Sequence, residues 1–268
     1  MSLLVSEAPG GRCTLTIGVL TKNEAHRIEA CLRSAAFADQ LLVVDSGSTD
    51  DTVACARAAG ATVVACPDWQ GFGVQRTRLL AHATGDYLFF LDADETITPP
   101  LQAELQAVVA SGAVGVWCVR WRLVAFGQEL KYFRSQAKPE RLFRRSTLLS
   151  YEGVVHEEAK LSEPELPRHV FRSPVLHHSR ETVRSSLLKL TQYTMLGAAK
   201  RAQRGKRGGV LRGLASGLSM FMRLYVLHLG FLCGAAGFLY CVFVSLESFF
   251  RYAAMRFDRD QLTQTEGR

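Results

Sequence analysis

The sequence predicts an α/β fold built on a doubly wound, mostly parallel β-sheet. From Leu15 onward, short apolar runs typical of strands alternate with amphipathic stretches typical of helices. The apolar runs are continuous, as expected for parallel strands that helices cover on both faces. With 268 residues, of which 48% are hydrophobic, the chain is long enough to bury such a sheet.

The first part of the chain supplies four expected strands, with the sequences LTIGVL (15–20), QLLVVD (40–45), TVVA (62–65) and YLFFL (87–91). Three expected helices lie between them. In the first, TKNEAHRIEACLRSAA, Ile28 and Leu32 share one face. The second has Thr49 or Asp50 as its N-cap and Gly60 as its C-terminal stop. The third runs through GVQRTRLLAHATG.

The pattern changes after a further helix. Pro99 and Pro100 stand where this helix, LQAELQAVVASG, is expected to begin. Residues 115–161 are then rich in aromatic and β-branched residues with glycine between them, which predicts antiparallel strands and loops. We expect this half to cover one side of a site.

The net charge of +7 is concentrated ahead of the most apolar part of the chain. Against the single acid Glu181, this segment holds nine basic residues: Arg180, Arg184, Lys189, Lys200, Arg201, Arg204, Lys206, Arg207 and Arg212. Basic segments can face nucleic acid, anionic lipid or only solvent. No nucleic-acid-binding motif accompanies them, so we expect an anionic membrane surface as partner and no nucleic acid.

The most apolar stretch, residues 224–246, holds 23 residues without a formal charge, and a membrane span needs about 20. Gly230, Gly234, Gly237 and His228 interrupt it. The stretch therefore fits a single span, helices or a re-entrant hairpin lying in the membrane interface, or a buried helix of a soluble protein. The basic residues before it predict a peripheral, monotopic or single-span protein at the cytoplasmic face of the inner membrane.

Two further features are typical of a protein whose folded part stays inside the cell. The seven cysteines form no C-x-x-C pair and no metal-ligand spacing, which predicts reduced thiols. The N-terminus, MSLLVSEAPGGRC, has neither a basic region nor a long apolar core, so we do not expect a signal peptide.

Polar residues end three of the expected strands, in TKNE (21–24), DSGSTD (45–50) and DADE (92–95). Ligands of such sheets bind beyond the carboxyl ends of the strands, so these residues are candidates for one site. Each motif could instead cap a helix or form a solvated turn, but capping does not explain the acid that ends both VVD and FLD. Asp92 and Asp94 would share a face of a continuing strand, where a cation would relieve their repulsion.

Two motifs of the second half also carry candidate residues. RLFRR holds Arg141, Arg144 and Arg145, which could contact phosphate or only face solvent. GVVHEE holds His156 and Glu157, a potential metal ligand beside a potential base, although a lone histidine is more often structural.

Four motifs stand together in this chain: TIGVLTKNEAHRIEACLRSA, LLVVDSGSTDDTVACA, QRTRLLAHATGDYLFFLDADE and GVVHEE. With them, the chain resembles the family-2 glycosyltransferases of the GT-A fold from about residue 14 to residue 253. It looks most like their lipopolysaccharide-core β-1,4-glucosyltransferase branch, to which LKLTQYTMLGAAKRAQRGKR and LHLGFLCGAAGFLY are also similar. The resemblance implies an inverting, metal-dependent transfer of a hexose from a UDP-sugar to a lipid-linked saccharide such as lipopolysaccharide core.

The resemblance also implies the residues of the site. The nucleotide-sugar pocket would comprise Thr21, Asn23, Glu24, Asp45, Ser46, Gly47, Arg76, Asp92, Ala93, Arg141 and Arg144. In it, Asp45 would read the base and Arg76 would lie near the diphosphate, although Thr77 stands where the family has asparagine. A cofactor, Mg²⁺ or Mn²⁺, is expected on Asp92, Asp94 and His156, with Asp94 as the more direct ligand.

The chemistry explains why these residue types are needed. A nucleoside diphosphate leaves only when its developing negative charge is neutralised, which a divalent cation and arginines can do. The acceptor hydroxyl needs a carboxylate base on the opposite face of the sugar for displacement with inversion. Glu157 is the expected base, with Glu95 and Glu158 as alternatives.

On this interpretation, the chain has five segments. They are an N-terminal tail (1–13), a catalytic domain (14–180), a basic helical segment (181–212), apolar membrane-associated helices (213–253) and a polar tail (254–268). Within the catalytic domain, residues 14–112 form the nucleotide-sugar-binding half and residues 113–180 the acceptor-side half.

Two other classes of protein are alternatives. A nucleotidyltransferase on a similar sheet would normally show a glycine-rich phosphate loop after its first strand, and GVLTKNEA has none. A non-catalytic, membrane-associated protein that binds sugar nucleotides would keep the same fold. The full set of carboxylates argues against that alternative, and a measurement of turnover decides it.

Overall fold

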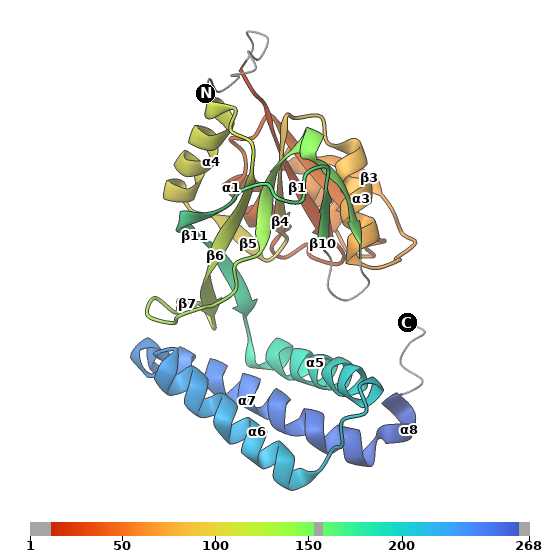
Figure 1. The fold of residues 1–268 in the computed structure, drawn as a ribbon, viewed down its shortest axis with the longest axis vertical. Coiled ribbons are helices and arrows are strands. Elements are labelled where there is room, and N and C mark those ends of the chain that lie inside the picture. Colours follow the sequence, from red (N-terminus) through yellow and green to blue (C-terminus); the bar gives the residue numbers. More distant parts are fainter. Residues whose placement is uncertain (1–11, 153–157, 263–268) are drawn as a thin grey trace. The chain divides into compact units, whose positions relative to one another are not determined.

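The computed structural model describes residues 12–152 and 158–262. The chain divides into two compact units, which are Met1–Trp121 with Gln136–His177 and Arg122–Ser135 with His178–Arg268. The first unit carries most of the β-sheet, and the second carries the C-terminal helices (Figure 1).

The N-terminal half of the sheet is parallel. Its strands are β1 (Leu15–Thr21), β2 (Gln40–Asp45), β3 (Thr62–Ala65) and β4 (Tyr87–Asp92), and they lie in the order β3-β2-β1-β4. Helices connect them, namely α1 (Ile28–Ser34), α2 (Thr52–Ala58) and α3 (Phe72–His82). Parallel neighbours need such crossover connections, and the sequence predicted both the strands and the helices.

Beyond β4, the pairing of the described strands becomes antiparallel. The sheet continues through β8 (Glu140–Arg144), β6 (Val116–Ala125), β11 (Arg168–Arg180) and β5 (Glu95–Ile97), and β7 (Gln128–Glu129) pairs with β6. A separate hairpin consists of β9 (Leu148–Glu152) and β10 (Glu158–Leu161), after the short helix η1 (Arg145–Thr147). The α/β fold class is therefore confirmed, as are the antiparallel strands of the second half.

Helix α4 (Pro99–Ser111) begins where the two prolines predicted it. Thr98 is its N-cap, and its side chain accepts a hydrogen bond from the Leu101 N–H. Helix α2, by contrast, begins later than predicted, with Asp51 as an N-cap that makes no side-chain capping bond. The Asp50 carboxylate still accepts a hydrogen bond from the Thr52 N–H at 3.1 Å. Asp50 therefore binds the first turn of α2, although it stands one residue before the N-cap. Gly60 ends α2 with φ +85°, as expected of a C-terminal stop.

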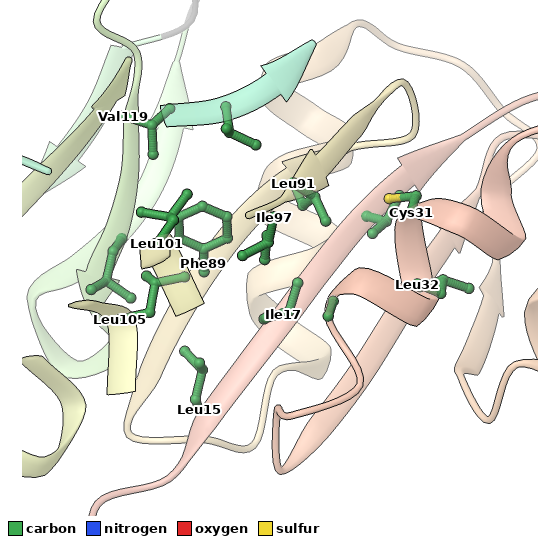
Figure 2. Close-up of a cluster of buried hydrophobic side chains, with 14 of the residues drawn as sticks. Leu15, Ile17, Cys31, Leu32, Phe89, Leu91, Ile97, Leu101, Leu105 and Val119 are labelled. Carbon is green, nitrogen blue, oxygen red and sulfur yellow. The ribbon is translucent and has the colours of Figure 1, made fainter. Parts of the chain in front are cut away.

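Side chains of β4 alternate between two hydrophobic clusters. Phe89 and Leu91 belong to one cluster, together with residues of β1, α1 and α4 (Figure 2). Leu88 and Phe90 belong to the other, together with Leu79 of α3. Successive strand side chains point to opposite faces, so both faces of β4 are buried and the strand is apolar throughout. Because the buried run ends at Leu91, the polar residues that follow begin at the end of β4.

The second unit is mainly helical. It contains α5 (Val183–Gln203), α6 (Val210–Met222), the helical turns η2 (Arg223–Leu227) and η3 (Gly230–Cys233), α7 (Gly234–Phe257) and α8 (Arg259–Leu262). Helix α7 packs against both α5 and α6, and the three run alongside one another (Figure 1). Residues 122–135 also belong to this unit, whereas the sequence assigned them to the acceptor-side half. By length and composition alone, Val210–Leu227 and Gly230–Phe257 could each cross a membrane.

Candidate active site

Three parallel strands end side by side in polar residues. In the registers of β1 with its two neighbours, Thr21 lies opposite Asp45 and Leu20 lies opposite Asp92. The strand ends that the sequence singled out therefore lie along one edge of the sheet. Ligands of α/β sheets bind at this edge.

The carboxylate of Asp45 closes the loop that follows β2. Its Oδ2 accepts from the N–H groups of Gly47 at 3.1 Å and Ser48 at 3.0 Å, and the Ser48 hydroxyl donates to its other oxygen. Gly47 has φ +83°, which glycine adopts without strain. Ser46 is buried, and its Oγ lies 3.2 Å from Nε2 of the buried Gln75. Asp45 and Ser46 thus fix the shape of this loop.

The residues after β1 lock onto the same loop. Asn23 has φ +57°, its N–H donates to Ser48 Oγ at 2.9 Å, and its Oδ1 accepts from the Thr49 N–H at 2.8 Å. Thr21 Oγ1 is buried and, within the described residues, makes no hydrogen bond. Burying a hydroxyl without a partner costs free energy. Thr21 therefore offers an unsatisfied polar group to a ligand at this edge.

A turn separates the two aspartates after β4. Asp92 ends β4, Glu95 begins β5, and Ala93 and Asp94 lie between the two strands. The Asp92 N–H donates to Glu95 Oε2 at 3.0 Å, which closes the turn. The two aspartates therefore do not share the face of one continuing strand, and each has its own cationic neighbours.

Arg141 joins Asp92 to Glu95. Its Nη1 donates to Asp92 Oδ1 at 3.1 Å, and its Nη2 donates both to Asp92 Oδ2 and to Glu95 Oε1, the latter at 2.9 Å. Trp121 Nε1 donates to the same Glu95 oxygen at 2.6 Å. Arg141 is 2% exposed and Glu95 is 1% exposed. A buried charge needs such paired and hydrogen-bonded surroundings.

The neighbours of these carboxylates set their protonation. Burial raises the pKa of Glu95 to about 7, although the charge of Arg141 acts to lower it. Burial also acts to raise the pKa of Asp92, but the charge and hydrogen bonds of Arg141, with the charges of Arg76 and His177, bring it below its ordinary value. Asp92 is therefore ionised at neutral pH.

Asp94 contacts a histidine and an arginine. Its Oδ2 lies 3.4 Å from His177 Nε2 and 3.8 Å from Arg27 Nη1. Arg27 Nε also lies 2.6 Å from Glu24 Oε2, so Glu24 and Asp94 share one cation. Burial acts to raise the pKa of Asp94, but its hydrogen bond with His177, and the charges of His177 and Arg27, bring it below the ordinary value. Asp94 is thus a second ionised carboxylate at this edge.

Arg76 adds a further cation next to Asp92. Its Nη2 lies 3.8 Å from Asp92 Oδ1, and its guanidinium lies over the rings of Phe90 and Tyr151. The neighbouring Thr77 accepts from the Tyr151 N–H at 2.9 Å through its hydroxyl. Thr77 therefore links α3 to β9, which is a structural role.

Arg144 lies away from this edge, which corrects its expected place in the nucleotide pocket. It pairs with Tyr87, the first residue of β4, and its Nη1 donates to the Gly112 carbonyl at 2.8 Å. Asp92 ends the same strand, and each residue advances a strand by about 3.3 Å. Arg144 thus serves the opposite end of the sheet. Arg145 likewise donates to a backbone carbonyl, that of Gly85, at 2.7 Å.

The structure describes two of the three residues expected to hold a metal, Asp92 and Asp94. His156 and Glu157 lie outside the described residues, so the ligand and the base expected there stay predictions. Among the described residues, no three His, Cys, Asp or Glu side chains are grouped so that they could hold a metal ion. Asp92 faces Arg141, but Asp94 Oδ2 and His177 Nε2 converge at 3.4 Å. A cation that also binds substrate phosphates needs only one or two carboxylates, so this pair fits one.

Sequence reasoning did not identify His177, Arg27 or Trp121. The available signal for His177 was the doublet HH at the end of an apolar run, PVLHH. Only the antiparallel pairing of β11 with β5 shows that His177 lies opposite Glu95. Arg27 directly precedes α1 at its N-cap position, and its approach to Asp94 depends on how α1 and the end of β4 pack together.

Comparison with known proteins gives a family and relatives. The family model described as glycosyl transferase family 2 matches residues 16–158. An uncharacterized glycosyltransferase of Rickettsia felis is 25% identical over 249 residues, which cover 89% of this chain and 88% of that protein. The lipopolysaccharide core biosynthesis glycosyltransferase LpsC of Rhizobium meliloti is 26% identical over 236 residues, which cover 84% of this chain and 85% of that protein.

Solved structures are similar over part of the chain. Glucosyl-3-phosphoglycerate synthase from Mycobacterium tuberculosis, in complex with Mn²⁺, UDP and glucosyl-3-phosphoglycerate, is 29% identical with a TM-score of 0.37. That alignment covers 43% of this chain and 50% of the solved one. S. aureus TarS, in complex with UDP-GlcNAc, is 19% identical with a TM-score of 0.47, and its alignment covers 63% of this chain and 59% of the solved one.

Proposed function

This chain belongs to glycosyl transferase family 2, and we propose that it transfers a hexose from a UDP-sugar to a lipid-linked saccharide with inversion of configuration. We further propose that the reaction needs Mg²⁺ or Mn²⁺. Family membership supports the class of enzyme, a glycosyltransferase. The diphosphate and the metal are inferred from the charges of the site, and the acceptor from the relative LpsC. The hexose, the uridine base and the inversion follow from the resemblance of the sequence motifs to this family.

The observation that carries the proposal is the group of charges at the end of β4. Two ionised aspartates, Asp92 and Asp94, lie within reach of Arg27, Arg76 and Arg141. Arginine binds phosphate through charge-assisted hydrogen bonds, and carboxylates bind divalent cations. A site that holds both arginines and carboxylates can bind a nucleoside diphosphate together with its cation.

We assign the donor to the edge formed by the ends of β1, β2 and β4. The unsatisfied hydroxyl of Thr21 and the loop that Asp45 closes would line the nucleoside. Arg76 would contact the diphosphate, because its guanidinium lies beside Asp92 at this edge and is held there over the rings of Phe90 and Tyr151. Arg141 is too enclosed by Asp92 and Glu95 for that role, and we assign it to holding Asp92 in place.

Asp94 and His177 would hold the cation. When bound, a divalent cation supplies positive charge that neutralises the leaving diphosphate. Asp94 is kept ionised by its neighbours, and His177 lies beside it. The diphosphate oxygens would complete the set of ligands.

The acceptor hydroxyl would lose its proton to Glu157, which stays the proposed base. Glu95 suits a positioning role instead, because it is buried and its two oxygens accept from the Asp92 N–H, Trp121 and Arg141. A base must be within hydrogen-bond reach of the substrate proton, and an enclosed carboxylate is not.

Two observations support a lipid-linked acceptor at the cytoplasmic face of the inner membrane. The relative LpsC is named for lipopolysaccharide core biosynthesis. Two helical stretches of the second unit are apolar and long enough to associate with a membrane, and a basic segment precedes them. An enzyme held at a membrane meets a lipid-linked acceptor without a search through bulk solution.

The experiment that tests the proposal is a donor screen of the purified, detergent-solubilised protein. Release of nucleoside diphosphate is measured from a panel of sugar nucleotides with Mn²⁺, with Mg²⁺ and with a chelator. We expect release from one UDP-hexose that requires the metal, is lost in Asp94→Asn and is kept in Asp258→Asn, a matched change at the end of α7. Addition of a truncated lipopolysaccharide should raise the rate, and NMR of the product should show the inverted anomer. A protein that neither binds nor cleaves any sugar nucleotide would contradict the proposal and favour a non-catalytic protein.

A further inference from the structure

Helix α6 carries an exposed apolar face that the proposed reaction does not use. Leu211 is 82% exposed, Leu214 54%, Leu218 66% and Met222 50%. Residues spaced by three or four positions lie on one face of a helix. An exposed row of large apolar side chains marks a surface that meets an apolar partner.

The packing of α6 against α7 turns this face outward. A Cβ atom on Gly213 would lie 2.8 Å from the Phe249 carbonyl oxygen, and one on Gly217 would lie 3.1 Å from that of Ser245. Ser216 Oγ lies 2.7 Å from Ser248 Oγ in the same contact. A larger side chain at either glycine would meet the backbone of α7, so α6 turns this face of small residues toward α7. The exposure of the leucines therefore follows from the helix packing itself.

We propose that this face docks on an anionic lipid bilayer, with α6 lying in the plane of the membrane and not crossing it. The inference deepens the proposed function and rests on it in one respect, the lipid-linked acceptor. It decides between the three arrangements that the apolar C-terminal sequence allows.

The contacts at the far end of α6 argue against a span. His228, just after α6 and η2, is 8% exposed, and its Nδ1 lies 2.6 Å from the Arg134 carbonyl oxygen. The Arg134 N–H donates to the His228 carbonyl at 3.0 Å. Arg134 and Lys131 are charged, exposed and three residues apart in the same segment. A spanning α6 would carry this charged segment to the opposite side of about 30 Å of hydrocarbon.

The contacts of α7 lead to the same conclusion. Glu247, in the middle of the helix, forms a buried ion pair with Arg180 at the end of β11. One turn further, the Arg251 side chain packs against Gly197 of α5, and Arg201 Nη1 donates to the Tyr252 hydroxyl at 2.6 Å. Charged side chains at the centre of a span cost at least about 2.5 kcal/mol each. The middle and C-terminal parts of α7 therefore pack against charged side chains from other parts of the same unit, so lipid does not surround the helix there.

The charges around the apolar face favour lipid over a protein partner. Exposed Arg212 lies at the start of the row and Arg223 at its end, and exposed Lys206 and Arg207 precede it. An apolar row bordered by basic residues is the pattern of helices that lie among anionic headgroups.

The depth of single spin labels tests the orientation. The labels are attached through p-acetylphenylalanine, which avoids the native cysteines, in the variants Leu211→p-acetylphenylalanine and its equivalents at Leu214, Leu218 and Met222. The protein is added to vesicles of phosphatidylcholine and phosphatidylglycerol, and depth is measured from the relative accessibility to oxygen and to a nickel chelate. We expect all four labels at one depth, about 5–10 Å below the headgroups. A label at Leu149 on β9, which is 61% exposed, should stay in water.

Two results would overturn the inference. A depth that changes steadily from Leu211 to Met222, by about 1.5 Å per residue, would show that α6 crosses the bilayer. Four labels in water, with a dimer seen by light scattering, would show that a second copy of the chain covers the face. A second measurement is the affinity of the protein for the same vesicles. The double variant Leu214→Gln/Leu218→Gln should bind them at least about tenfold more weakly, whereas Leu149→Gln should not change the affinity. Neither measurement needs turnover, so its failure and that of the donor screen are distinguishable.

Discussion

Arg141 is the residue that organises the charges at the candidate site. It lies almost fully buried between Asp92 and Glu95 and donates hydrogen bonds to both carboxylates. Removing one partner of a buried ion pair costs more than the pair itself contributes, because the remaining charge is left without compensation. The site is therefore held together by a residue that, on our proposal, does not contact substrate.

We predict that Arg141→Met lowers the free energy of unfolding by about 3–5 kcal/mol, as measured by urea denaturation at neutral pH. The double variant Arg141→Met/Glu95→Gln should recover part of that loss, since the amide removes one unpaired charge. The control is Arg33→Met, which breaks the exposed ion pair with Glu29 and should cost less than about 1 kcal/mol. Equal losses in Arg141→Met and Arg33→Met would show that the buried network contributes no special stability.

A second prediction separates the proposed base from its neighbour. Glu157→Gln should keep the affinity for the donor and lower transfer to the acceptor by at least about a hundredfold, because an amide cannot accept the proton of the hydroxyl. Glu158→Gln, the matched change at the start of β10, should keep most of the activity. Donor affinity is measured by calorimetry and transfer by product formation. Normal transfer in Glu157→Gln would remove this residue from the role.

At the scale of the elements, the strand ends were predictable and their partners were not. Continuous apolar runs locate β1, β2 and β4, and the parallel connections place Thr21, Asp45 and Asp92 at one edge. The pairing of Arg141 with Asp92 and Glu95 depends on β8 lying against β4, and the place of His177 depends on β11 lying against β5. Antiparallel strands distant in sequence carry no local signal of their partner or register. For the same reason, Arg144 could not be told from Arg141 until the register showed which end of the sheet each one serves.

Asp86, which precedes β4, binds Thr14, which precedes β1, and this contact should make the stability of the fold depend on pH. Asp86 Oδ2 accepts from the Thr14 N–H at 2.8 Å and from the Thr14 hydroxyl at 3.0 Å. These bonds, the backbone one first, lower the pKa of Asp86 below its ordinary value of 3.8. A lowered folded-state pKa contributes stability above the unfolded value, and this contribution is lost as the pH falls through the folded value.

We therefore expect Asp86→Asn to be less stable than the parent chain by a constant amount between about pH 7 and pH 5. The difference in the free energy of unfolding should shrink below about pH 4, where the parent loses the charge as well. Urea denaturation at a series of pH values measures it. Glu163→Gln, an exposed change between β10 and β11, should show no such dependence. A difference that stays constant down to about pH 3 would mean that the charge of Asp86 contributes nothing.

At the scale of the whole molecule, charge and apolar surface are concentrated in the same unit. Five exposed basic residues lie before or at the start of the leucine row of α6, namely Arg184, Arg204, Lys206, Arg207 and Arg212. An anionic membrane can satisfy both features at once, since headgroups attract the basic side chains while acyl chains cover the apolar ones. The two contributions differ in their response to salt, because only the electrostatic one is screened.

That difference gives the last prediction. Each basic residue near an anionic surface contributes about 1 kcal/mol, so Lys206→Gln/Arg207→Gln should weaken binding to vesicles with phosphatidylglycerol about 30-fold at low salt. The effect should become small at about 1 M salt, where the Debye length falls to about 3 Å, while the parent chain keeps a residual affinity from the leucines of α6. Vesicle sedimentation over a salt series measures both. Arg33→Gln/Arg57→Gln removes two exposed basic residues from the first unit and should leave binding unchanged. Equal weakening by the two double variants would mean that only the net charge of the protein acts, and that the basic segment has no defined place at the membrane.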